Sequence, residues 1–276
     1  MLKFIPFNLK GIDLSYRDYA TIENDIQSYN PTIIGQDESG DYNIYSFKIG
    51  NPSKPKIYIM ASMHGTEWHG TIIILEFVER LLKRTFPDSQ FVSKLLGSYC
   101  LVIVPVMNPW GYDRQYRYGS TDTEFNNDFN EWTQSETRAI RDHVISEKPF
   151  AFLDFHLMQP DYVTHDIVVS HGHPRTRWVS NYIGRSFQAK TGLPFTQWIN
   201  SNDPSTSTNS RFWVVGNGSP NTDEVVSATF EITRYDVFSN EEIMEYGLYL
   251  LYLFCSYAMN YAEHKTVAYQ KEVVTC

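Results

Sequence analysis

The stretch KIYIMASMHGTEWHGTIIILEFVERLLKR, residues 56–84, decides the fold. Its first six residues, Lys56–Ala61, form a continuous apolar run of the kind found in strands that are buried on both faces. From residue 67 to residue 84, apolar residues recur with the period of a helix. A buried strand that leads directly into a long helix is the basic unit of an α/β fold, in which helices cover a mostly parallel sheet.

The rest of the chain repeats this alternation of strands and helices. Further strands are predicted at residues 42–49, 100–106, 151–155, 167–170 and 227–232, and further helices or amphipathic segments at residues 15–29, 135–147, 175–191 and 241–263. Two stretches rich in Asn, Ser, Thr, Asp and Gly, residues 108–133 and 200–221, are predicted to be loops. The sequence contains no internal repeat and no long linker, so we expect one α/β domain over residues 1–276 with a helix-covered, largely parallel sheet.

The composition argues against several classes of partner. The 276 residues contain 23 Lys and Arg against 32 Asp and Glu, a formal charge of −9, whereas nucleic-acid binding needs clustered basic side chains. No apolar run approaches the ~18–20 residues of a membrane span, and residues 1–10 lack the apolar segment of a secretory signal. We therefore expect no nucleic-acid partner and no membrane partner, while the oligomeric state stays open.

The cysteines indicate the redox environment. Cys100, Cys255 and Cys276 are few, odd in number and not spaced like metal ligands. Proteins that fold in oxidising compartments commonly carry paired cysteines, whereas proteins in reducing compartments do not. Together with the lack of a signal segment, the cysteines predict a cytoplasmic location.

His64 and Glu67 follow the strand at residues 56–61 and open the predicted helix. In α/β sheets ligands bind outside the carboxyl ends of the strands, which is where these side chains are expected. Three residues apart at a helix entry, they can point to one spot. An imidazole and a carboxylate suit Zn²⁺, whose catalytic sites usually keep three protein ligands and one open position. The alternative is structural, with Glu67 favouring the helix start and His64 a polar loop residue.

Two further side chains at strand ends match this pair. His156 follows the strand at residues 151–155 and would lie at the same edge of the sheet as His64, either as a third ligand or as a half-buried structural histidine. Glu231 lies within the apolar strand at residues 227–232, where a carboxylate is costly unless it is paired or near a metal. Glu231 is therefore a candidate general base for metal-assisted hydrolysis, or else a structural ion-pair partner, for example of Arg234.

Taken in order along the chain, these residues resemble the zinc carboxypeptidase family, peptidase family M14. The matching motifs are H-x-x-E at His64 and Glu67, N-P-x-G at residues 108–111, the single His156, and F-E at residues 230–231. The resemblance covers about residues 56–235, and the short spacing between the first and third ligands is similar to that of compact bacterial members. It implies a three-layer α/β/α fold with a mixed, largely parallel central sheet, formed by a single zinc-hydrolase catalytic domain.

The resemblance implies a role for each matched position. His64, Glu67 and His156 would hold one Zn²⁺ per chain with water in the fourth place, and Glu231 would be the general base and acid. Arg117 falls where the family keeps an arginine that polarises the scissile carbonyl, which is a suitable task for a fixed cation beside a developing negative charge. Alternatively, Arg117 is a surface arginine in a long polar loop.

One departure from the family concerns its N-R-N segment, whose arginine grips the C-terminal carboxylate of a substrate. In a gap-free alignment the segment falls on Asn126, Asn127 and Asp128, and Asn126 and Asn127 would contact the substrate. If a short insertion is allowed, residues 128–131 become the counterpart and Glu131 takes the place of the arginine. The arginine is missing in both registers, and neither an amide nor an acid keeps the charge complementarity of a guanidinium.

A second departure concerns the tyrosine that caps the substrate in this family, expected shortly before the base. No tyrosine lies between Tyr182 and Tyr235. The same loop carries Arg211, which is either a replacement grip for the substrate carboxylate or a solvated loop arginine. Four other histidines are expected to lie outside the ligand set: His69, His165, His171 and His173.

The resemblance implies a zinc-dependent, metallocarboxypeptidase-like hydrolase that cleaves a peptide or amide bond of a small peptide by metal-activated water. Because the carboxylate-binding arginine is missing, the identity of the substrate stays open. One alternative is an N-acyl amino acid amidohydrolase of the aspartoacylase or succinylglutamate desuccinylase type, which would act on acylated amino acids. Another is a catalytically weak zinc-binding protein, although the presence of Glu231 together with all three ligands favours an enzyme.

Overall fold

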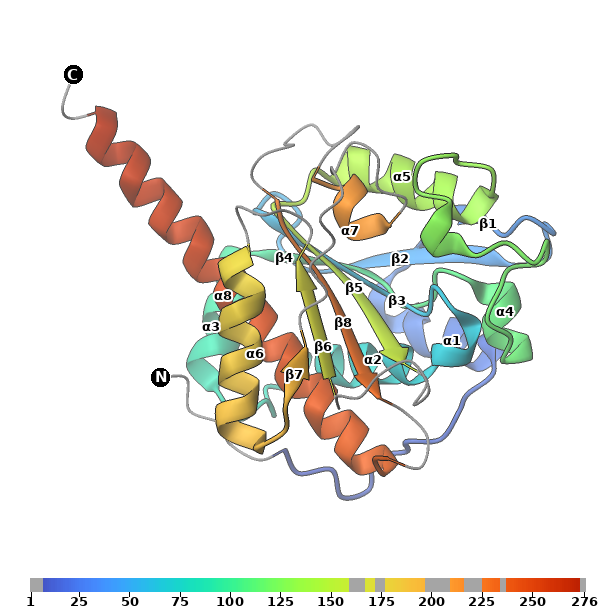
Figure 1. Cartoon of the computed structure of the whole chain (residues 1–276), viewed down its shortest axis with the longest axis horizontal. Helices are drawn as coiled ribbons and strands as arrows, with labels where there is room; N and C mark the ends of the chain where they lie inside the picture. The colour runs from blue at the N-terminus through green and yellow to red at the C-terminus, as the bar shows by residue number, and fades with distance from the viewer. Residues whose placement is uncertain are drawn as a thin grey trace.

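An eight-stranded sheet forms the centre of the computed structural model, which describes residues 7–158, 167–171, 177–196, 209–215, 225–233 and 237–273 (Figure 1). The strand order is β1-β2-β4-β3-β5-β8-β6-β7. The strands are Thr32–Gln36 (β1), Asn43–Gly50 (β2), Lys56–Ala61 (β3), Cys100–Val104 (β4), Ala151–Met158 (β5), Ile167–His171 (β6), Phe195–Thr196 (β7) and Val226–Thr233 (β8).

The four central strands, β4, β3, β5 and β8, run parallel to one another, so their carboxyl ends meet at one edge of the sheet. On one side β2 is antiparallel to β4 and β1 is antiparallel to β2. On the other side β6 is antiparallel to β8, and β7 is parallel to β6. The sheet is therefore mixed and largely parallel, which confirms the predicted fold class.

Helices cover both faces of this sheet (Figure 1). The α-helices are Tyr19–Ile26 (α1), His69–Leu82 (α2), Ser89–Ser98 (α3), Pro109–Arg114 (α4), Ser135–Glu147 (α5), Arg177–Thr191 (α6), Ser210–Trp213 (α7) and Asn240–Val273 (α8), and 3₁₀ turns lie at Gln27–Tyr29 (η1), Gly65–Glu67 (η2) and Phe125–Asn127 (η3). Helices α2 and α8 pack on one face, and α5 and α7 pack on the other. The last part of α8 extends beyond the sheet. In the part of the chain that the structure describes, no helix is both long and apolar enough to cross a membrane.

The apolar run of β3 contributes to the cores on both faces. Ile57 and Ile59 pack in the cluster that includes α2 and α8, whereas Tyr58 and Met60 pack in the cluster that includes α5 and α7. All four side chains are fully buried. Because successive side chains of a strand point to opposite faces, a strand covered by helices on both sides needs apolar residues at every position.

Several predicted boundaries shift in the structure. The helix predicted to start at residue 67 begins as α2 at His69, because Gly65–Glu67 first forms the 3₁₀ turn η2. Strand β4 ends at Val104, before the predicted end at residue 106, since Pro105 has no N–H to continue the ladder. The predicted loop at residues 108–133 contains the short elements α4 and η3.

The pattern of apolar residues also missed complete elements. Helix α3 was not predicted; Asp88 caps it by accepting a hydrogen bond from the backbone N of Phe91 at 2.9 Å. The edge strands β1 and β7 were not predicted either, because β1 is mostly exposed and β7 has two residues. The predicted loop at residues 200–221 lies largely outside the described residues, but its described part contains α7.

Candidate metal centre

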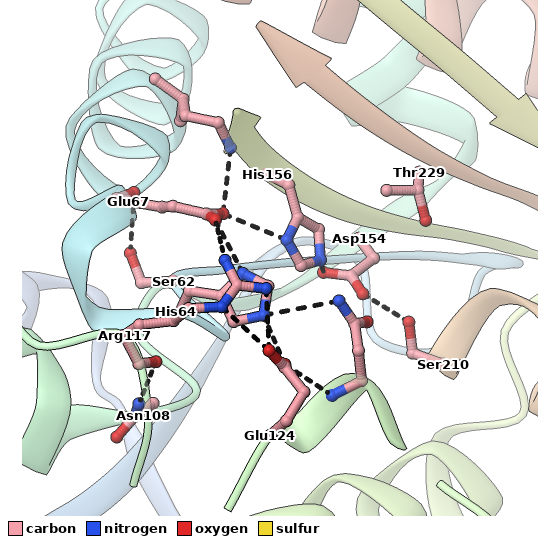
Figure 2. Close-up of polar contacts among 12 residues, drawn as sticks. Ser62, His64, Glu67, Asn108, Arg117, Glu124, Asp154, His156, Ser210 and Thr229 are labelled. Atoms are coloured by element: carbon pink, nitrogen blue, oxygen red, sulfur yellow. Dashed lines mark hydrogen bonds and ion pairs between the residues drawn. The ribbon is translucent and has the colours of Figure 1, made fainter. Parts of the chain in front are cut away.

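The three predicted metal ligands lie together at the carboxyl edge of the sheet (Figure 2). His64 follows β3, Glu67 ends η2, and His156 lies in the last part of β5. One ligand atom from each residue lies within 4.8 Å of the others, and all three side chains are buried. Within the described residues, no other group of three His, Cys, Asp or Glu side chains comes together in this way.

Glu67 lies between the two imidazole rings. Its Oε1 is 2.7 Å from His64 Nδ1, and its Oε2 is 3.1 Å from His156 Nδ1. The backbone N of Leu157 also donates a hydrogen bond to Oε2 at 3.0 Å. Burial alone would raise the pKa of Glu67, but the two histidines outweigh burial and hold the pKa well below its ordinary value. Glu67 is therefore an ionised carboxylate that faces both Nδ1 atoms.

Each histidine presents its other ring nitrogen to a second carboxylate. His64 Nε2 lies 2.7 Å from Glu124 Oε1, and His156 Nε2 lies 3.0 Å from Asp154 Oδ1. Burial alone would lower the pKa of both imidazoles, but the surrounding carboxylates raise it. The two Nδ1 atoms thus face Glu67, while the two Nε2 atoms face outer carboxylates.

The donor set fits a zinc ion. Zn²⁺ takes imidazole nitrogen and carboxylate oxygen as ligands, and catalytic sites combine three such ligands with an open position. His64, Glu67 and His156 supply two imidazoles and one carboxylate whose donor atoms face one another. The outer carboxylates on the Nε2 atoms are the partners that metal-binding histidines usually have.

The turn after β3 fixes the direction of the chain that carries His64. Ser62 adopts a left-handed conformation with φ of 52° and is fully buried. Its Oγ shares a hydrogen bond with Thr71 Oγ1 at 2.8 Å and donates to the carbonyl of Glu67 at 3.3 Å. This side chain therefore ties the end of β3 to the start of α2, with His64 and Glu67 between them.

The N-P-x-G motif supports this turn from the other side. Asn108 caps α4 by accepting a hydrogen bond from the backbone N of Gly111 at 2.9 Å, and its Nδ2 donates to the carbonyl of Tyr118 at 3.1 Å. Gly111 lies directly against Gly65, where an added Cβ would come within 2.0 Å of the Gly111 carbonyl carbon. Because the Gly65 N also donates to the carbonyl of Arg117 at 3.3 Å, the motif places Arg117 next to the ligand turn.

Arg117 lies beside the ligand set, held by Glu124. Its Nε and Nη2 are 2.9 and 2.8 Å from Glu124 Oε2, and its Nη1 is 3.7 Å from Glu67 Oε1. Burial alone would raise the pKa of Glu124, but His64 and Arg117 lower it to about 2. Glu124 was missed by the sequence analysis, because the polar loop contains several acidic residues and only the folded chain shows which of them reaches His64.

Asn126 also approaches the ligand set, which favours the gap-free alignment of the N-R-N segment. Its Nδ2 lies 3.4 Å from His64 Nε2, and the neighbouring Asn127 is exposed. Asp128 instead faces the start of α5, where it accepts hydrogen bonds from the backbone N of Thr133 at 2.9 Å and of Gln134 at 3.0 Å. Asp128, with which the alternative register begins, is thus hydrogen-bonded at the start of α5.

Glu231 lies in β8 directly across from His156 in β5. Residues paired across neighbouring strands point to the same face of the sheet, so its carboxyl group is on the side of the ligand set. Burial raises the pKa of Glu231 above its ordinary value, against the lowering effect of His156.

Arg211, in α7, is a buried arginine with only 7% of its surface exposed, so it is not a solvated loop residue. Its Nη1 donates to Thr229 Oγ1 at 3.4 Å, and Ser227 Oγ donates to its carbonyl at 2.6 Å. Burial lowers the pKa of the guanidinium, while the charges of Glu231 and Asp154 oppose this shift. Arg211 therefore approaches the region of Glu231 from the α7 side of the sheet.

The other candidate residues lie outside the ligand set or outside the described part of the chain. The His69 ring stacks on the ring of Trp68 with centroids 3.5 Å apart, and its Nε2 lies 3.2 Å from Asn240 Oδ1, so it lies outside the ligand set. His165, His173, Arg234 and the side chain of His171 lie outside the described residues.

The chain is similar in sequence to a known protein family. The model of the zinc carboxypeptidase family matches residues 28–191, which include the three candidate ligands. Human carboxypeptidase D is 32% identical over 163 residues, and the match covers 52% of this chain and 11% of the human protein. Rat carboxypeptidase B is 32% identical over 117 residues, which cover 37% of this chain and 28% of the rat protein. The match thus spans a small part of the length of these relatives.

Solved structures with a similar fold include bacterial metallo-carboxypeptidases. The protein from Burkholderia cenocepacia has a TM-score of 0.69 at 16% identity, with 88% of this chain and 68% of that chain covered. The protein from Pseudomonas aeruginosa, solved in complex with (2-guanidinoethylmercapto)succinic acid, has a TM-score of 0.64 at 16% identity, with 87% and 68% covered. At this level of identity the likeness shows the fold.

Proposed function

Because the chain belongs to the zinc carboxypeptidase family, we propose that it is a zinc-dependent metallopeptidase that hydrolyses a peptide or amide bond. Members of this family are zinc-dependent hydrolases. In this chain the buried set of His64, Glu67 and His156 lies beside Glu231, and this arrangement carries the proposal. A metal site with an adjacent carboxylate is what metal-assisted hydrolysis requires.

His64, Glu67 and His156 would hold one Zn²⁺ per chain. When bound, the ion supplies Lewis-acid activation of the scissile carbonyl and of a water molecule. Glu231 would accept the proton of the attacking water and return it to the nitrogen of the leaving amine. Since burial raises the pKa of Glu231, its carboxylate accepts a proton from water more readily than the carboxylate of an ordinary glutamate does.

Arg117 would stabilise the oxyanion that develops as the carbonyl is attacked. Glu124 holds the guanidinium through Nε and Nη2, and Nη1 points toward the ligand set. A cation that is already in place before the reaction needs little reorganisation to stabilise developing negative charge.

The substrate would be a small peptide or an acylated amino acid, bound by Asn126, Asn127 and Arg211. Asn126 lies at the ligand set and Asn127 is exposed on the same turn, which supports a role for their amides as hydrogen-bond partners of a substrate backbone. Neither amide carries the positive charge that a free carboxylate requires. Arg211 is the candidate cation for that role, since it lies near Thr229 and Glu231 in β8.

Hydrolysis of matched substrates, combined with metal analysis, tests this function. We expect about one zinc per chain and hydrolysis of short peptides. If Arg211 grips the carboxylate, a free-acid peptide is cleaved much faster than its C-terminal amide, and Arg211→Gln abolishes this preference while Arg211→Lys partly keeps it. Equal cleavage of acid and amide would exclude Arg211 from that role. Cleavage of acylated amino acids alone would favour an amidohydrolase, and bound zinc without any hydrolysis would favour a binding protein.

We further propose that residues 1–276 form one catalytic domain in the cytoplasm. The described strands all belong to one sheet, which supports a single domain. Cys100 and Cys255 are buried free thiols, which suits a reducing compartment. Limited proteolysis tests the domain organisation, and cell fractionation tests the location.

A further inference from the structure

We propose that Asp154 is a positioning residue that holds the imidazole of His156 so that its Nδ1 faces the other residues of the ligand set. The proposal rests on the proposed zinc site, and it assigns a function to a carboxylate that the family motifs in this sequence do not include. Asp154 precedes His156 by two residues in β5, so both side chains point to the same face of the sheet. Its Oδ1 lies 3.0 Å from His156 Nε2.

The carboxylate of Asp154 is itself held in place from α7. Ser210, the first residue of α7, donates a hydrogen bond from its Oγ to Asp154 Oδ2 (Figure 2). Both side chains are buried, each with 1% of its surface exposed. One oxygen of Asp154 therefore faces Ser210 and the other faces His156, which leaves the carboxylate little freedom to turn away.

This arrangement determines which nitrogen of His156 is available to a metal. A neutral imidazole carries its proton on one nitrogen and a lone pair on the other, and the partner of one nitrogen sets the state of the other. The negative charge of Asp154 Oδ1, 3.0 Å from Nε2, favours the tautomer with the proton on Nε2, which leaves the lone pair on Nδ1, the atom 3.1 Å from Glu67 Oε2. A carboxylate in this position also raises the basicity of the ligand nitrogen.

His64 also lies between Glu67 and an outer carboxylate, and in its case both contacts are hydrogen bonds. His64 presents Nδ1 to Glu67 and Nε2 to Glu124, at 2.7 Å in each case. Two imidazoles in one site, each held between Glu67 and its own outer carboxylate, indicate that Asp154 acts on His156 as Glu124 acts on His64.

Asp128 provides a matched control, because it is a buried carboxylate that does not contact a metal ligand. Its oxygens accept hydrogen bonds from the backbone and hydroxyl groups of residues 133–137 at the start of α5. Replacing Asp128 should therefore lower stability without changing the metal site, whereas replacing Asp154 should change the metal site itself.

The test compares the parent protein with Asp154→Asn, Ser210→Ala and Asp128→Asn. Zinc dissociation constants are measured by competition with a chromogenic chelator, and the visible spectrum of the cobalt-loaded protein reports the geometry around the metal. We expect zinc binding about 10- to 100-fold weaker in Asp154→Asn, as found for outer partners of metal ligands. Ser210→Ala should weaken it about 2- to 10-fold, the effect of one hydrogen bond. Asp128→Asn should keep the parent dissociation constant and cobalt spectrum but unfold at a lower temperature.

If the zinc affinity and the cobalt spectrum are unchanged in both Asp154→Asn and Ser210→Ala, the proposal is overturned. If Asp154→Asn does not fold, the result for Ser210→Ala decides alone. If the parent protein binds zinc but hydrolyses no substrate, and Asp154→Asn no longer binds zinc, the positioning role is supported and the proposed enzymatic function is refuted. A parent protein that binds no zinc would refute both.

Discussion

Glu231 in β8 is paired with His156 in the neighbouring parallel strand β5. This pairing puts the Glu231 carboxyl group next to a candidate metal ligand, where it can act as a general base. We predict that Glu231→Gln lowers kcat by about 10²- to 10⁴-fold, the usual contribution of a general base. The amide keeps the size of the side chain but cannot take a proton from water. Because Glu231 is not one of the three candidate ligands, the zinc content should stay at the parent level. Steady-state kinetics and metal analysis check this, and a variant with near-parent kcat would remove Glu231 from the role of base.

The contact between Gly65 and Gly111 gives a second prediction at the scale of single residues. An added Cβ at position 65 would lie 2.0–2.4 Å from backbone atoms of Gly111 and Tyr112. Backbone atoms cannot move aside as the end of a flexible side chain can. We expect Gly65→Ala to displace η2, weaken zinc binding and destabilise the fold by about 1–3 kcal/mol.

Gly97→Ala is the matched control for this substitution. Gly97 lies in α3, and an added Cβ there has no neighbour within 4 Å. Since alanine favours a helix over glycine, this variant should be more stable than the parent by up to about 1 kcal/mol. Chemical denaturation and chelator competition measure both effects. Parent-like zinc affinity in Gly65→Ala would show that the turn adapts without the close contact.

The candidate ligands are more easily predicted from the sequence than the residues that hold them. His64 and Glu67 are close in the chain and directly follow a strong strand pattern, so their spacing alone brings them together. Glu124 and Asp154 reach the same site through the fold, by the path of a long loop and by the alternation of side chains in β5. An acid in a polar loop or in a strand is common, and its partner becomes apparent only when distant segments meet.

At the scale of elements, the start of α5 carries an unusual buried acid. Glu136 is fully buried, and neither of its carboxylate oxygens forms a hydrogen bond within the described structure. Burial, together with the nearby charges of Asp37 and Glu38, raises the pKa of Glu136 to about 7. Because the folded protein then holds this proton more tightly than the unfolded chain does, stability should fall as the pH rises from about 4.5 to about 7.

We therefore predict that Glu136→Gln removes part of the pH dependence of stability. Near pH 4.5 the carboxyl group is protonated in the folded protein, so parent and variant should have similar free energies of unfolding. Above pH 7 the variant should be more stable by up to about 3 kcal/mol, since each pKa unit corresponds to about 1.4 kcal/mol. Urea denaturation at several pH values measures the difference. Parallel curves for the two proteins would show that Glu136 does not titrate in this range.

The elements that were predicted and those that were missed differ in how strongly they are buried. Strands β3 and β4 are buried along their length and give unmistakable apolar runs. Strand β1 is exposed at three of its five positions, so its sequence carries no regular apolar signal. Such edge strands are specified by pairing with a neighbour, as β1 pairs with β2, and this long-range information is absent from a local pattern.

At the scale of the whole molecule, removal of the metal should lower thermal stability. Without an ion, the buried site brings together Glu67, Glu124, Asp154 and two histidines whose interactions depend on protonation. A ligand that binds only the folded state stabilises it by about 2.7 kcal/mol when its concentration is 100 times the dissociation constant. For a protein of this size this corresponds to a difference of roughly 5–10 °C in Tm.

Thermal unfolding with excess zinc and with a chelator measures this difference. Magnesium in place of zinc is the control, because Mg²⁺ prefers oxygen ligands in octahedral geometry and should not reproduce the shift. Equal Tm values with zinc and with the chelator would contradict a zinc site linked to folding.

The position of His64 after β3 and of His156 in β5 has a consequence for the order of folding. These strands pair side by side in the sheet, although β4 and several helices lie between them in the chain. Contacts between distant segments are slow to form, because closing the long loop between them costs conformational entropy. His64 and His156 therefore come within reach of one ion only when the centre of the sheet is complete. The visible absorption of bound cobalt should then rise only in the last phase of refolding. Cobalt binding would therefore report when β3 and β5 have paired in the sheet.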